Sequence, residues 1–492
     1  MKKRTFTKFS KYAFIGILII VILATVFHYP IQIIDALSSI PVDGYGINIS
    51  ALRIIFEPFI GSLLFYLRAD QPLIEFAVLL FWILSLSLII SIISQVFKKN
   101  TKSLKPALCN ILSWLKKTVL IIGIWLGLLV YIVFGTMPAN TIVNTLDNTI
   151  LVNTHSHSEY SHDGIISQEN LLKWHKNSKF DAFFITDHNH HEKTFEAVKA
   201  QENGTLPSSP LIIAGEEFSG SNHMTLLGLK RNFITRGLTD QQVIDSTHND
   251  NGVVIVAHWF DGERESIPFF LNLDVDGFEI ANQAVGLKYE KRIFNNIAEA
   301  CSSNGLIMNG VADYHGYGST CFAWNALDIP GWHAMDNMQK RKSILDILRQ
   351  KDMSKIKVLL YNDRVVFDRS QVLLSPVYTF ISYFRTLNFL QLLSWLIWVI
   401  IIGNIRDFLI KRNKVKELKI SNLQIMEGIS FFFSLYLLLL GINLLNKAKP
   451  LTDFNDIYAE YGIQLVWAGS FFLIYTIILV LVELRKYKMK KI

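Results

Sequence analysis

The chain has 492 residues, of which 51% are hydrophobic, and its mean hydropathy is +0.31. This hydropathy is concentrated in long apolar runs near both ends, which excludes an ordinary soluble globular protein and indicates a membrane protein with a polar middle. The net charge of +7 does not predict nucleic-acid binding, because the basic residues cluster beside the apolar runs and form no basic, aromatic-rich groove.

Six apolar runs are long enough to cross a bilayer, which takes roughly 20 residues. A seventh run, 51–67, contains Arg53, Glu57 and Pro58, so we expect it to be an interfacial or buried helix rather than a span. The six candidate spans are residues 12–28, 73–97, 118–136, 387–404, 428–445 and 463–483.

Lysine and arginine set the expected orientation of these spans. They concentrate in four segments, and six spans would place all four on the same side of the membrane. This side is expected to be the cytoplasm, because cytoplasmic segments collect such residues. The four segments are 1–11, 98–117, 406–419 and 485–491, whereas the short segments on the other side hold only Arg53, Arg68, Lys447 and Lys449. Both termini are therefore expected in the cytoplasm and the middle outside it; a cytoplasmic middle would require an odd number of spans before it.

Three domains follow: a membrane region of three helices at 1–137, a polar domain at 138–375 and a second membrane region of three helices at 376–492. In the polar domain, nearly continuous apolar strands alternate with helices, which predicts parallel strands covered by helices. Seven such strands favour a barrel. The candidate strands are 150–155, 181–187, 211–217, 223–229, 252–258, 276–282 and 305–313, and the candidate helices are 167–179, 238–250 and 288–303.

All 13 histidines except His28 lie between residues 155 and 333. Histidines and carboxylates lie at the ends of most candidate strands, and in a βα barrel the carboxyl ends of the strands converge on one mouth. His155 and His157 are two residues apart, so both imidazoles face one side of an extended strand. Imidazole and carboxylate ligands together suit zinc, manganese or iron. The later candidates are Asp163, Asp187, His188, Glu217, His223, His258, Asp313 and His315.

The ordered motifs HxH, S-x-D-G, TDH, G-x-E, AH and D-x-H over residues 148–330 resemble the PHP (polymerase and histidinol phosphatase) superfamily of metal-dependent phosphoesterases. The resemblance implies a distorted (β/α)7 barrel, here flanked by transmembrane helices, with three divalent metal ions at its mouth. Two positions depart from the family pattern: Trp259 follows the histidine of AH, and Val311 and Ala312 precede Asp313. We expect both to change the pocket wall and not the ligands.

The resemblance also implies the ligand sets. One metal would take His155, His157, Glu217 and Asp313. A second would share Glu217 and take His223 and His258. A third would take Asp163, His188 and His315. Glu217 is chosen over Glu216 because it occupies the E position of the G-x-E motif. Among the nine implied ligands, His223 is the one whose position in the family pattern is least fixed.

The implied activity is hydrolysis of a phosphoester by a metal-bound hydroxide, without a covalent enzyme intermediate, with Glu217, Asp313 and His258 in the catalytic centre. Three divalent ions exceed the charge of the three carboxylates, which favours an anionic substrate. The expected substrate is a phosphorylated small molecule or envelope component. Two alternatives stay open: an amidohydrolase-type reaction on the same centre, and an inactive metal- or ligand-binding membrane sensor.

Several further residues near the motifs carry weaker expectations. Asp187 is expected to orient a histidine, and Arg264 is the candidate second phosphate contact. Glu279 and Asn282 either support the pocket or satisfy backbone groups. Loop positions exposed to solvent are expected for His162, His190 and His191, and helix surface positions for His175 and His248. The three cysteines lack CxxC spacing, which leaves open a single bridge between Cys301 and Cys321.

Overall fold

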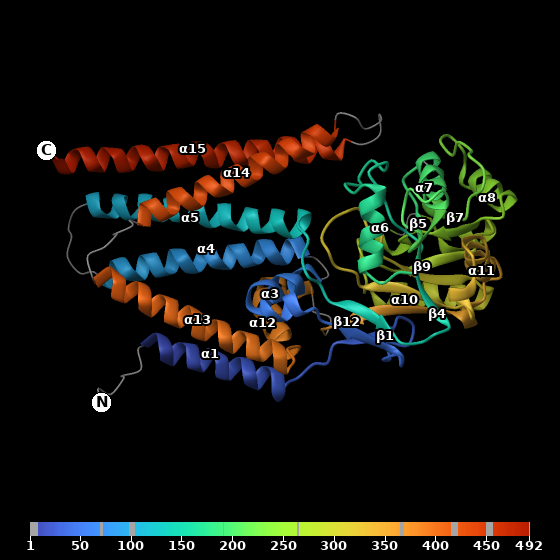
Figure 1. Cartoon of the computed structure of the whole chain (residues 1–492), viewed down its shortest axis with the longest axis horizontal. Helices are drawn as coiled ribbons and strands as arrows, with labels where there is room; N and C mark the ends of the chain where they lie inside the picture. Colours follow the sequence, from blue (N-terminus) through green and yellow to red (C-terminus); the bar gives the residue numbers. More distant parts are fainter. Residues whose placement is uncertain are drawn as a thin grey trace.

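A computed structural model describes residues 8–68, 72–97, 104–189, 191–262, 265–364, 369–414, 422–448 and 456–491. It has two parts: a bundle of long helices and, at one end of that bundle, an α/β unit (Figure 1). The bundle is formed by α1 (Lys8–Thr25), α4 (Pro72–Phe97), α5 (Leu104–Phe134), α13 (Phe389–Lys414), α14 (Asn422–Ala448) and α15 (Ile457–Lys491).

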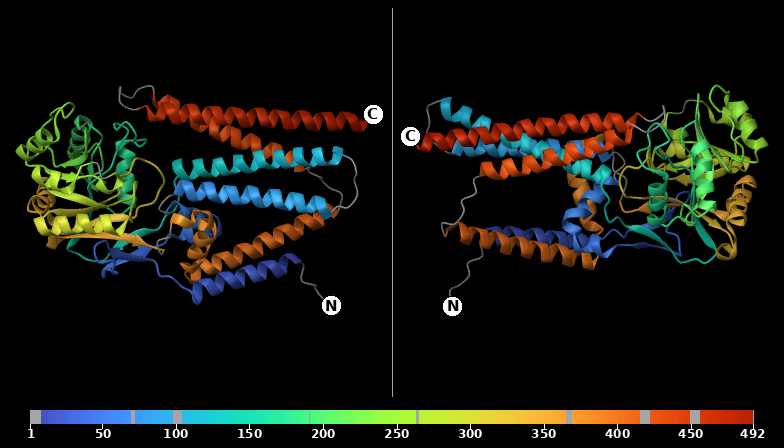
Figure 2. Two further views of the ribbon diagram at one scale, coloured as in Figure 1. Left: turned by 180° about the vertical axis from the view of Figure 1, so that it is seen from behind. Right: turned by 45° about the horizontal axis from the view of Figure 1, so that its top comes forward.

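Five of these helices are long and apolar enough to cross a membrane, and most of their surface is exposed in the described part of the chain. The apolar section of α1, Ala13–Thr25, is shorter. The first residues of α1, α5 and α14 and the last residues of α4, α13 and α15 lie at the end of the bundle remote from the α/β unit (Figures 1 and 2). The four basic segments adjoin these remote helix ends.

The α/β unit is built on one curled ten-stranded sheet, in the order β1-β12-β11-β4-β5-β6-β7-β8-β9-β10. All seven strands expected from the sequence are present. The strands are β1 (Gln32–Asp35), β4 (Thr149–Asn153), β5 (Ala182–Ile185), β6 (Leu211–Ser219), β7 (His223–Leu227), β8 (Val253–Val256), β9 (Gly277–Asn282), β10 (Ile307–Val311), β11 (Ala323–Asp328) and β12 (Ile356–Asn362).

The expectation that all strands are parallel is wrong for part of this sheet. Strands β4, β5 and β6 are parallel, as are β8, β9 and β10, but β7 runs antiparallel to both β6 and β8. Three residues separate β6 from β7, which suffices for a hairpin but not for the crossover that a parallel pair requires. The hairpin has a consequence for the site: the amino end of β7, where His223 lies, is at the same edge as the carboxyl ends of β6 and β8.

Helices pack on both faces of the sheet, and the last of them lies on the face opposite to the others. Ser167 caps α6 by accepting a hydrogen bond from the Asn170 backbone N–H, and Thr239 forms a capping box with Gln242 at the start of α8, as expected for helix starts. The covering helices are α6 (Gln168–Asn177), α7 (Glu192–Glu202), α8 (Asp240–Asn249), α9 (Ile267–Asn272), α10 (Lys291–Asn304) and α11 (Asn337–Arg349).

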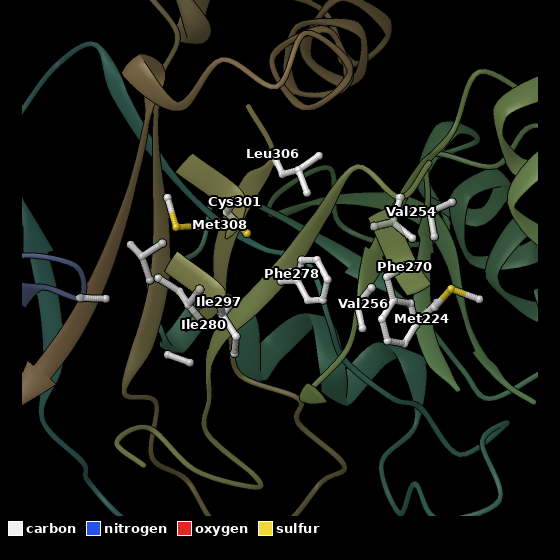
Figure 3. Packing of buried hydrophobic residues seen from close by; sticks show 14 of the residues in the cluster. Met224, Val254, Val256, Phe270, Phe278, Ile280, Ile297, Cys301, Leu306 and Met308 are labelled. Carbon is white, nitrogen blue, oxygen red and sulfur yellow. The ribbon is translucent and has the colours of Figure 1, made fainter. Parts of the chain in front are cut away.

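Both faces of the sheet are buried, which accounts for the continuous apolar runs in the sequence. Along β5, Ala182 and Phe184 belong to a cluster with α11, whereas Phe183 and Ile185 belong to a cluster with α6 and α7. Under β8 and β9, Val254, Phe278 and Ile280 pack against α8, α9 and α10 (Figure 3). Cys301 is buried in this cluster and Cys321 in another; both are free thiols, so the bridge left open by the sequence does not form.

The sheet curls until its last strand, β10, lies beside β4 and β11. The amide of Asn325 connects them: Nδ2 donates to Gly310 O at 2.8 Å and to Val152 O at 3.2 Å, and Oδ1 accepts from Gly310 N at 2.8 Å. The backbone N–H of Asp313 also donates to His155 O at 3.0 Å. These contacts bring the loops after β4 and β10 together.

Segments from the expected membrane regions join the two parts. β1 pairs with β12, and β2 (Tyr45–Asn48) pairs with β3 (Thr141–Asn144). The run 51–67 forms two short helices, α2 (Ala51–Ile55) and α3 (Glu57–Leu67), that pack against α12 (Ser375–Arg385) and α13. The buried Arg53 and Glu57 form an ion pair at 2.7 Å, and Tyr383 donates to Glu57 Oε1 at 2.8 Å, so the charges in this run are paired inside the protein.

Candidate metal centre

The curled sheet gathers all nine residues expected to bind metals at one edge. Most follow directly on a strand, and two of them, His258 (φ +31°) and Asp313 (φ +44°), adopt the left-handed conformation where the chain turns out of β8 and β10. Left-handed backbone at non-glycine residues is uncommon and concentrates at functional sites. Three groups could each hold an ion, with ligand atoms within 4.8 Å of one another: His155, His157, Glu217 and Asp313; His157, Asp163, His188 and His315; and His188, Glu217 and His223.

The first group is fully buried, and its ligand atoms are hydrogen-bond acceptors that face one another. His155 Nε2 lies 2.9 Å from His157 Nε2 and 2.9 Å from Glu217 Oε2. Asp313 Oδ1 lies 3.1 Å from His157 Nε2. Within the described part of the chain, this buried Asp313 oxygen has no hydrogen-bond partner of good geometry. A buried polar atom without a partner is costly, and an ion at this point would remove the cost.

The hydrogen-bond partners of Nδ1 fix the tautomers of His155 and His157. His155 Nδ1 lies 2.7 Å from Glu279 Oε1, which only accepts, so His155 Nδ1 carries a proton. Ser161 Oγ donates to Asp163 Oδ1 at 2.8 Å and can therefore accept from His157 Nδ1 at 3.2 Å. When both imidazoles are neutral, each turns a lone pair on Nε2 towards Glu217 and Asp313, which is the arrangement of histidines around a metal.

The electrostatics also require positive charge here. Burial opposes protonation of His157, but the acceptor carboxylates of Asp313 and Glu217 beside its Nε2 raise its pKa to about 10, so that this ring would take up a proton where no cation is bound. Burial would raise the pKa of Glu217, but His188 and His155 hold it well below the usual value. His155 Nε2 and His157 Nε2, 2.9 Å apart, cannot both carry a proton on the line between them. A divalent cation would satisfy both nitrogens and both carboxylates.

The second group is centred on Asp163 and is closer to solvent. Asp163 Oδ2 lies 3.1 Å from His315 Nε2 and 3.2 Å from His188 Nε2. His315 Nδ1 donates to the Asp313 backbone carbonyl at 2.9 Å, so its Nε2 is free to act as a ligand. The Asp163 side chain is 30% exposed, which makes this group the accessible side of the centre.

Glu217 connects the groups with its two oxygens. Oε2 faces His155, whereas Oε1 lies 2.8 Å from His223 Nδ1 and 3.3 Å from His258 Nε2. The neighbouring Glu216 points to the opposite face of β6, where it contacts His191 and Thr235. Strand alternation therefore places Glu217, and not Glu216, in the cluster.

Glu279 and Asn282 of β9 support the cluster from behind. Glu279 Oε1 bonds to His155, and Oε2 accepts from the His258 backbone N–H at 2.9 Å and from Asn282 Nδ2 at 3.1 Å. Asn282 Nδ2 also donates to Asp313 Oδ2 at 2.9 Å. The sequence left this role open. Strand alternation alone would separate these two residues, but an irregularity in β9 places Ile280 and Ala281 both in the core and turns Glu279 and Asn282 to the same side. Ser161 was missed, since a loop serine has no periodicity.

The expectations for the remaining residues had mixed outcomes. His175 is buried, not on the surface: its Nδ1 donates to Leu171 O at 2.9 Å and its Nε2 accepts from Asn153 Nδ2 at 2.9 Å. His191 is also buried: its Nδ1 donates to the Glu216 carboxylate, and its Nε2 accepts from the Phe233 backbone N–H. His162 is exposed as expected, and His248 is half-buried beside Asp276.

Among the described residues, the Asp187 carboxylate has no hydrogen bond with a histidine. The carboxylate instead accepts from the backbone N–H and the hydroxyl of Ser158 at 2.5 and 2.7 Å, which fixes the loop after His157. His190 and Arg264 lie outside the described residues. A small recess beside His223 and His258 is lined by Trp259, which places the first of the two departures from the family pattern at the pocket wall.

No family model matches the sequence, and no curated protein matches it. Several solved structures are similar to part of the chain at low identity. A two-domain protein from Bacteroides vulgatus containing a predicted PHP-like metal-dependent phosphoesterase has 15% identity and a TM-score of 0.34, over 44% of this chain and 66% of its own. This chain thus spans just under two thirds of that protein.

Two further structures cover less of this chain. A protein from Bifidobacterium adolescentis assigned to the metal-dependent phosphoesterases has 14% identity and a TM-score of 0.27, over 34% of this chain and 88% of its own. An amidohydrolase from Chromobacterium violaceum has 14% identity and a TM-score of 0.27, over 37% and 92%. These TM-scores are low, so the function proposed below rests on the geometry of the site.

Proposed function

We propose that this protein is a membrane-anchored metal-dependent phosphoesterase of the PHP type. The observation that carries the proposal is the buried group in which His155 Nε2, His157 Nε2, Glu217 Oε2 and Asp313 Oδ1 converge, with both imidazole tautomers set by outer partners. Four acceptors without a donor between them form a cation site. The (β/α)7 barrel is part of this proposal and is supported by the curl of the sheet.

The nine residues would hold three divalent ions, with manganese, zinc and iron as the candidates for this ligand set. Glu217 would bridge two of them, since its two oxygens face different histidines. His188 lies between the second and third groups, with Nε2 near Asp163 and Nδ1 3.3 Å from Glu217 Oε2. When bound, such ions lower the pKa of a water nucleophile and offset the charge of phosphoryl oxygens.

The chain itself orients the reacting groups. Glu279 fixes the ring of His155, and Asn282 holds one oxygen of Asp313 so that the other faces the cluster. The exposed side, formed by Asp163, His223 and His258, is where a substrate enters. His162, 64% exposed with its ring 4.6 Å from that of His188, is placed to give a proton to the leaving alkoxide.

The membrane arrangement belongs to the same proposal. With α1 as a sixth span, both termini and the basic segments lie in the cytoplasm, and the α/β unit lies outside it. The remote position of the helix ends that adjoin the basic segments supports this orientation (Figure 1). Substrates on that side are phosphorylated envelope components or phosphorylated small molecules, and Arg264 is proposed as a second phosphate contact. No nucleic-acid partner is proposed.

The test is turnover by the purified full chain in detergent with manganese, zinc or iron, on a panel of phosphomonoesters, phosphodiesters and amides. Glu217→Gln and Asp313→Asn should each lower phosphoester turnover by at least about 100-fold, since each removes a charge from the buried group. Glu290→Gln, at an exposed position paired with Arg292, is the matched control and should leave turnover unchanged.

Amide hydrolysis with no phosphoester hydrolysis would replace the proposal with the amidohydrolase alternative. A folded, metal-loaded protein without turnover on any substrate would favour the sensor.

A further inference from the structure

A cavity of about 320 Å³ lies where the helices meet the α/β unit. Its walls come from α3, α4 and α12 on one side, and from β12 and the loop 283–288 on the other. None of the nine metal-site candidates lines it. It is nevertheless at the same end of the sheet as the metal site: β12 is antiparallel to β11, which is antiparallel to β4, so β12 and β4 end at the same edge.

Part of the helix side of this cavity is apolar and continues into an exposed apolar surface. Phe65, Ile74 and Val372 contribute to the wall. Beside them, Leu373 is 61% exposed and Ile381 of α12 is 39% exposed. This surface adjoins the first turns of α4, one of the five helices long enough to cross a membrane. An acyl chain fits such a surface, since exposed apolar patches of this kind mark membrane or partner contacts.

The charged residues of the lining carry one excess positive charge, because Arg68, Lys288 and Arg364 outnumber the carboxylates of Glu75 and Asp363. Arg68 and Arg364 both pair with Asp363, at 2.5 and 2.8 Å, and Glu75 accepts from Thr379 Oγ1 at 2.7 Å. Lys288 is different: among the described residues its Nζ has one bond, to Asn362 Oδ1 at 2.9 Å, and no carboxylate pairs with it. Burial lowers the pKa of Lys288, which shows that the ammonium lacks full compensation from its surroundings. An anionic group in the cavity would provide that compensation.

Among the described residues, a polar group on the helix side of the cavity lacks a hydrogen-bond partner. Ser375, the first residue of α12, lines the cavity and is 1% exposed, and within the described chain its Oγ has no hydrogen-bond partner. It lies at the amino end of an 11-residue helix that has no side-chain cap. The positive end of the helix dipole favours an anion at such a position.

We propose that this cavity binds the phosphate-bearing headgroup of a membrane amphiphile, with Lys288 and Ser375 as headgroup contacts and the apolar surface of α12 beside the acyl chain. The inference is independent of the proposed hydrolase activity, because it concerns binding at residues outside the metal centre. An anionic phospholipid is the ligand class that matches a phosphate site joined to an apolar helix surface at a membrane boundary.

The experiment measures binding of phosphatidic acid to the purified full chain in neutral detergent micelles with EDTA present, so that metal-dependent turnover plays no part. Phosphatidylcholine is the zwitterionic comparison. Lys288→Gln should weaken phosphatidic acid binding by roughly 10-fold, the value of a charge-assisted hydrogen bond to phosphate. Lys291→Gln, the same charge change at an exposed position outside the cavity, should bind like the parent.

Ser375→Ala is the second variant, chosen because it deletes one hydroxyl that makes no hydrogen bond to any described residue. It should weaken binding several-fold without lowering the Tm, and it decides the question alone if Lys288→Gln does not fold. Equal binding by the parent and both cavity variants would overturn the proposal. Displacement of the lipid by inorganic phosphate at equal concentration would also overturn it, because the site would then recognise a free anion and not an amphiphile.

Discussion

Glu279 shows how one buried carboxylate determines the chemistry of several neighbours. It bonds to the ring of His155, the backbone of His258 and the amide of Asn282, yet it belongs to none of the three candidate metal groups. Because it accepts from His155 Nδ1, it leaves Nε2 of His155 as the free ligand atom. Such outer partners of metal-binding histidines commonly contribute as much to a site as a ligand does.

Replacing Glu279 by Gln should lower metal affinity by roughly 10- to 100-fold while leaving the fold intact, because the amide weakens the hold on the His155 ring. Metal titration of the purified full chain, followed by calorimetry, measures the change. The exposed Glu290→Gln variant is the control for loss of a carboxylate. An affinity equal to that of the parent would show that Glu279 does not orient His155.

His175 gives the protein a pH dependence that is separate from the metal site. Burial lowers its pKa from 6.5 to about 3. Between these two values the unfolded chain binds a proton that the folded chain does not, so the free energy of unfolding falls as pH decreases from 6.5 to 3. At pH 5 the loss from this residue is roughly 2 kcal/mol relative to pH 7.

His175→Phe tests this dependence, because a phenyl ring can keep the stacking on Phe183. The variant should be less stable than the parent at pH 7, since Asn153 loses an acceptor, but its stability should fall less steeply between pH 7 and pH 5, by about 2 kcal/mol. Denaturant unfolding of the full chain in detergent with EDTA provides both values. The same slope for parent and variant would mean that His175 is not neutral in the fold.

At the scale of elements, the loop 158–166 carries Asp163 on a tight turn. Gly164 passes so close to the Ser158 carbonyl that a Cβ at Gly164 would lie 1.9 Å from that oxygen. The backbone of Ile165 donates to His315 O at 2.8 Å, so the turn also fixes the position of the loop after β10. The glycine of the S-x-D-G motif is therefore required by space, not by an unusual φ angle.

Gly164→Ala should lower the free energy of unfolding by about 1–3 kcal/mol and displace Asp163, since the backbone must move to admit the methyl group. After dialysis, metal analysis should show that the group around Asp163 has lost its metal and that the buried group has kept its metal. Gly46→Ala, where a Cβ meets no atom within 4 Å, is the control. Full metal content in the Gly164→Ala variant would contradict this account.

The helices also hold the loops at the mouth of the sheet. Gly318 donates to Val133 O at 2.8 Å, and Ser319 accepts from the Met137 backbone N–H at 3.0 Å, which anchors the loop carrying His315 to the end of α5. Tyr458 of α15 donates to Glu159 Oε2 at 3.3 Å on the loop carrying Asp163. The accessible group of the candidate centre is thus attached directly to the helix bundle.

For the whole molecule, the testable property is the side of the membrane on which the α/β unit lies. Lys199 of α7 is exposed, so Lys199→Cys in a Cys109→Ser background gives one accessible thiol; Cys301 and Cys321 are buried. An impermeant maleimide should label it in intact cells. Labelling that requires permeabilised membranes would place the unit in the cytoplasm and reverse the proposed orientation.

Much of this protein is determined by sequence patterns alone. Long apolar runs give the membrane-type helices, because length and composition suffice to define a helix of that kind. Continuous apolar strands with polar residues at their ends give the seven central strands and the nine residues that gather at the mouth. Strand alternation separates Glu217 from Glu216, since a period of two assigns neighbouring residues to opposite faces.

Tertiary structure decided the rest, because it depends on partners distant in the chain. The addition of β1 from the amino-terminal region is set by its pairing with β12, which local patterns do not encode. His175 and His191 are buried because Asn153 and Glu216, far away in sequence, supply their hydrogen bonds. The cavity at Lys288 and Ser375 exists only where the helices pack against the sheet.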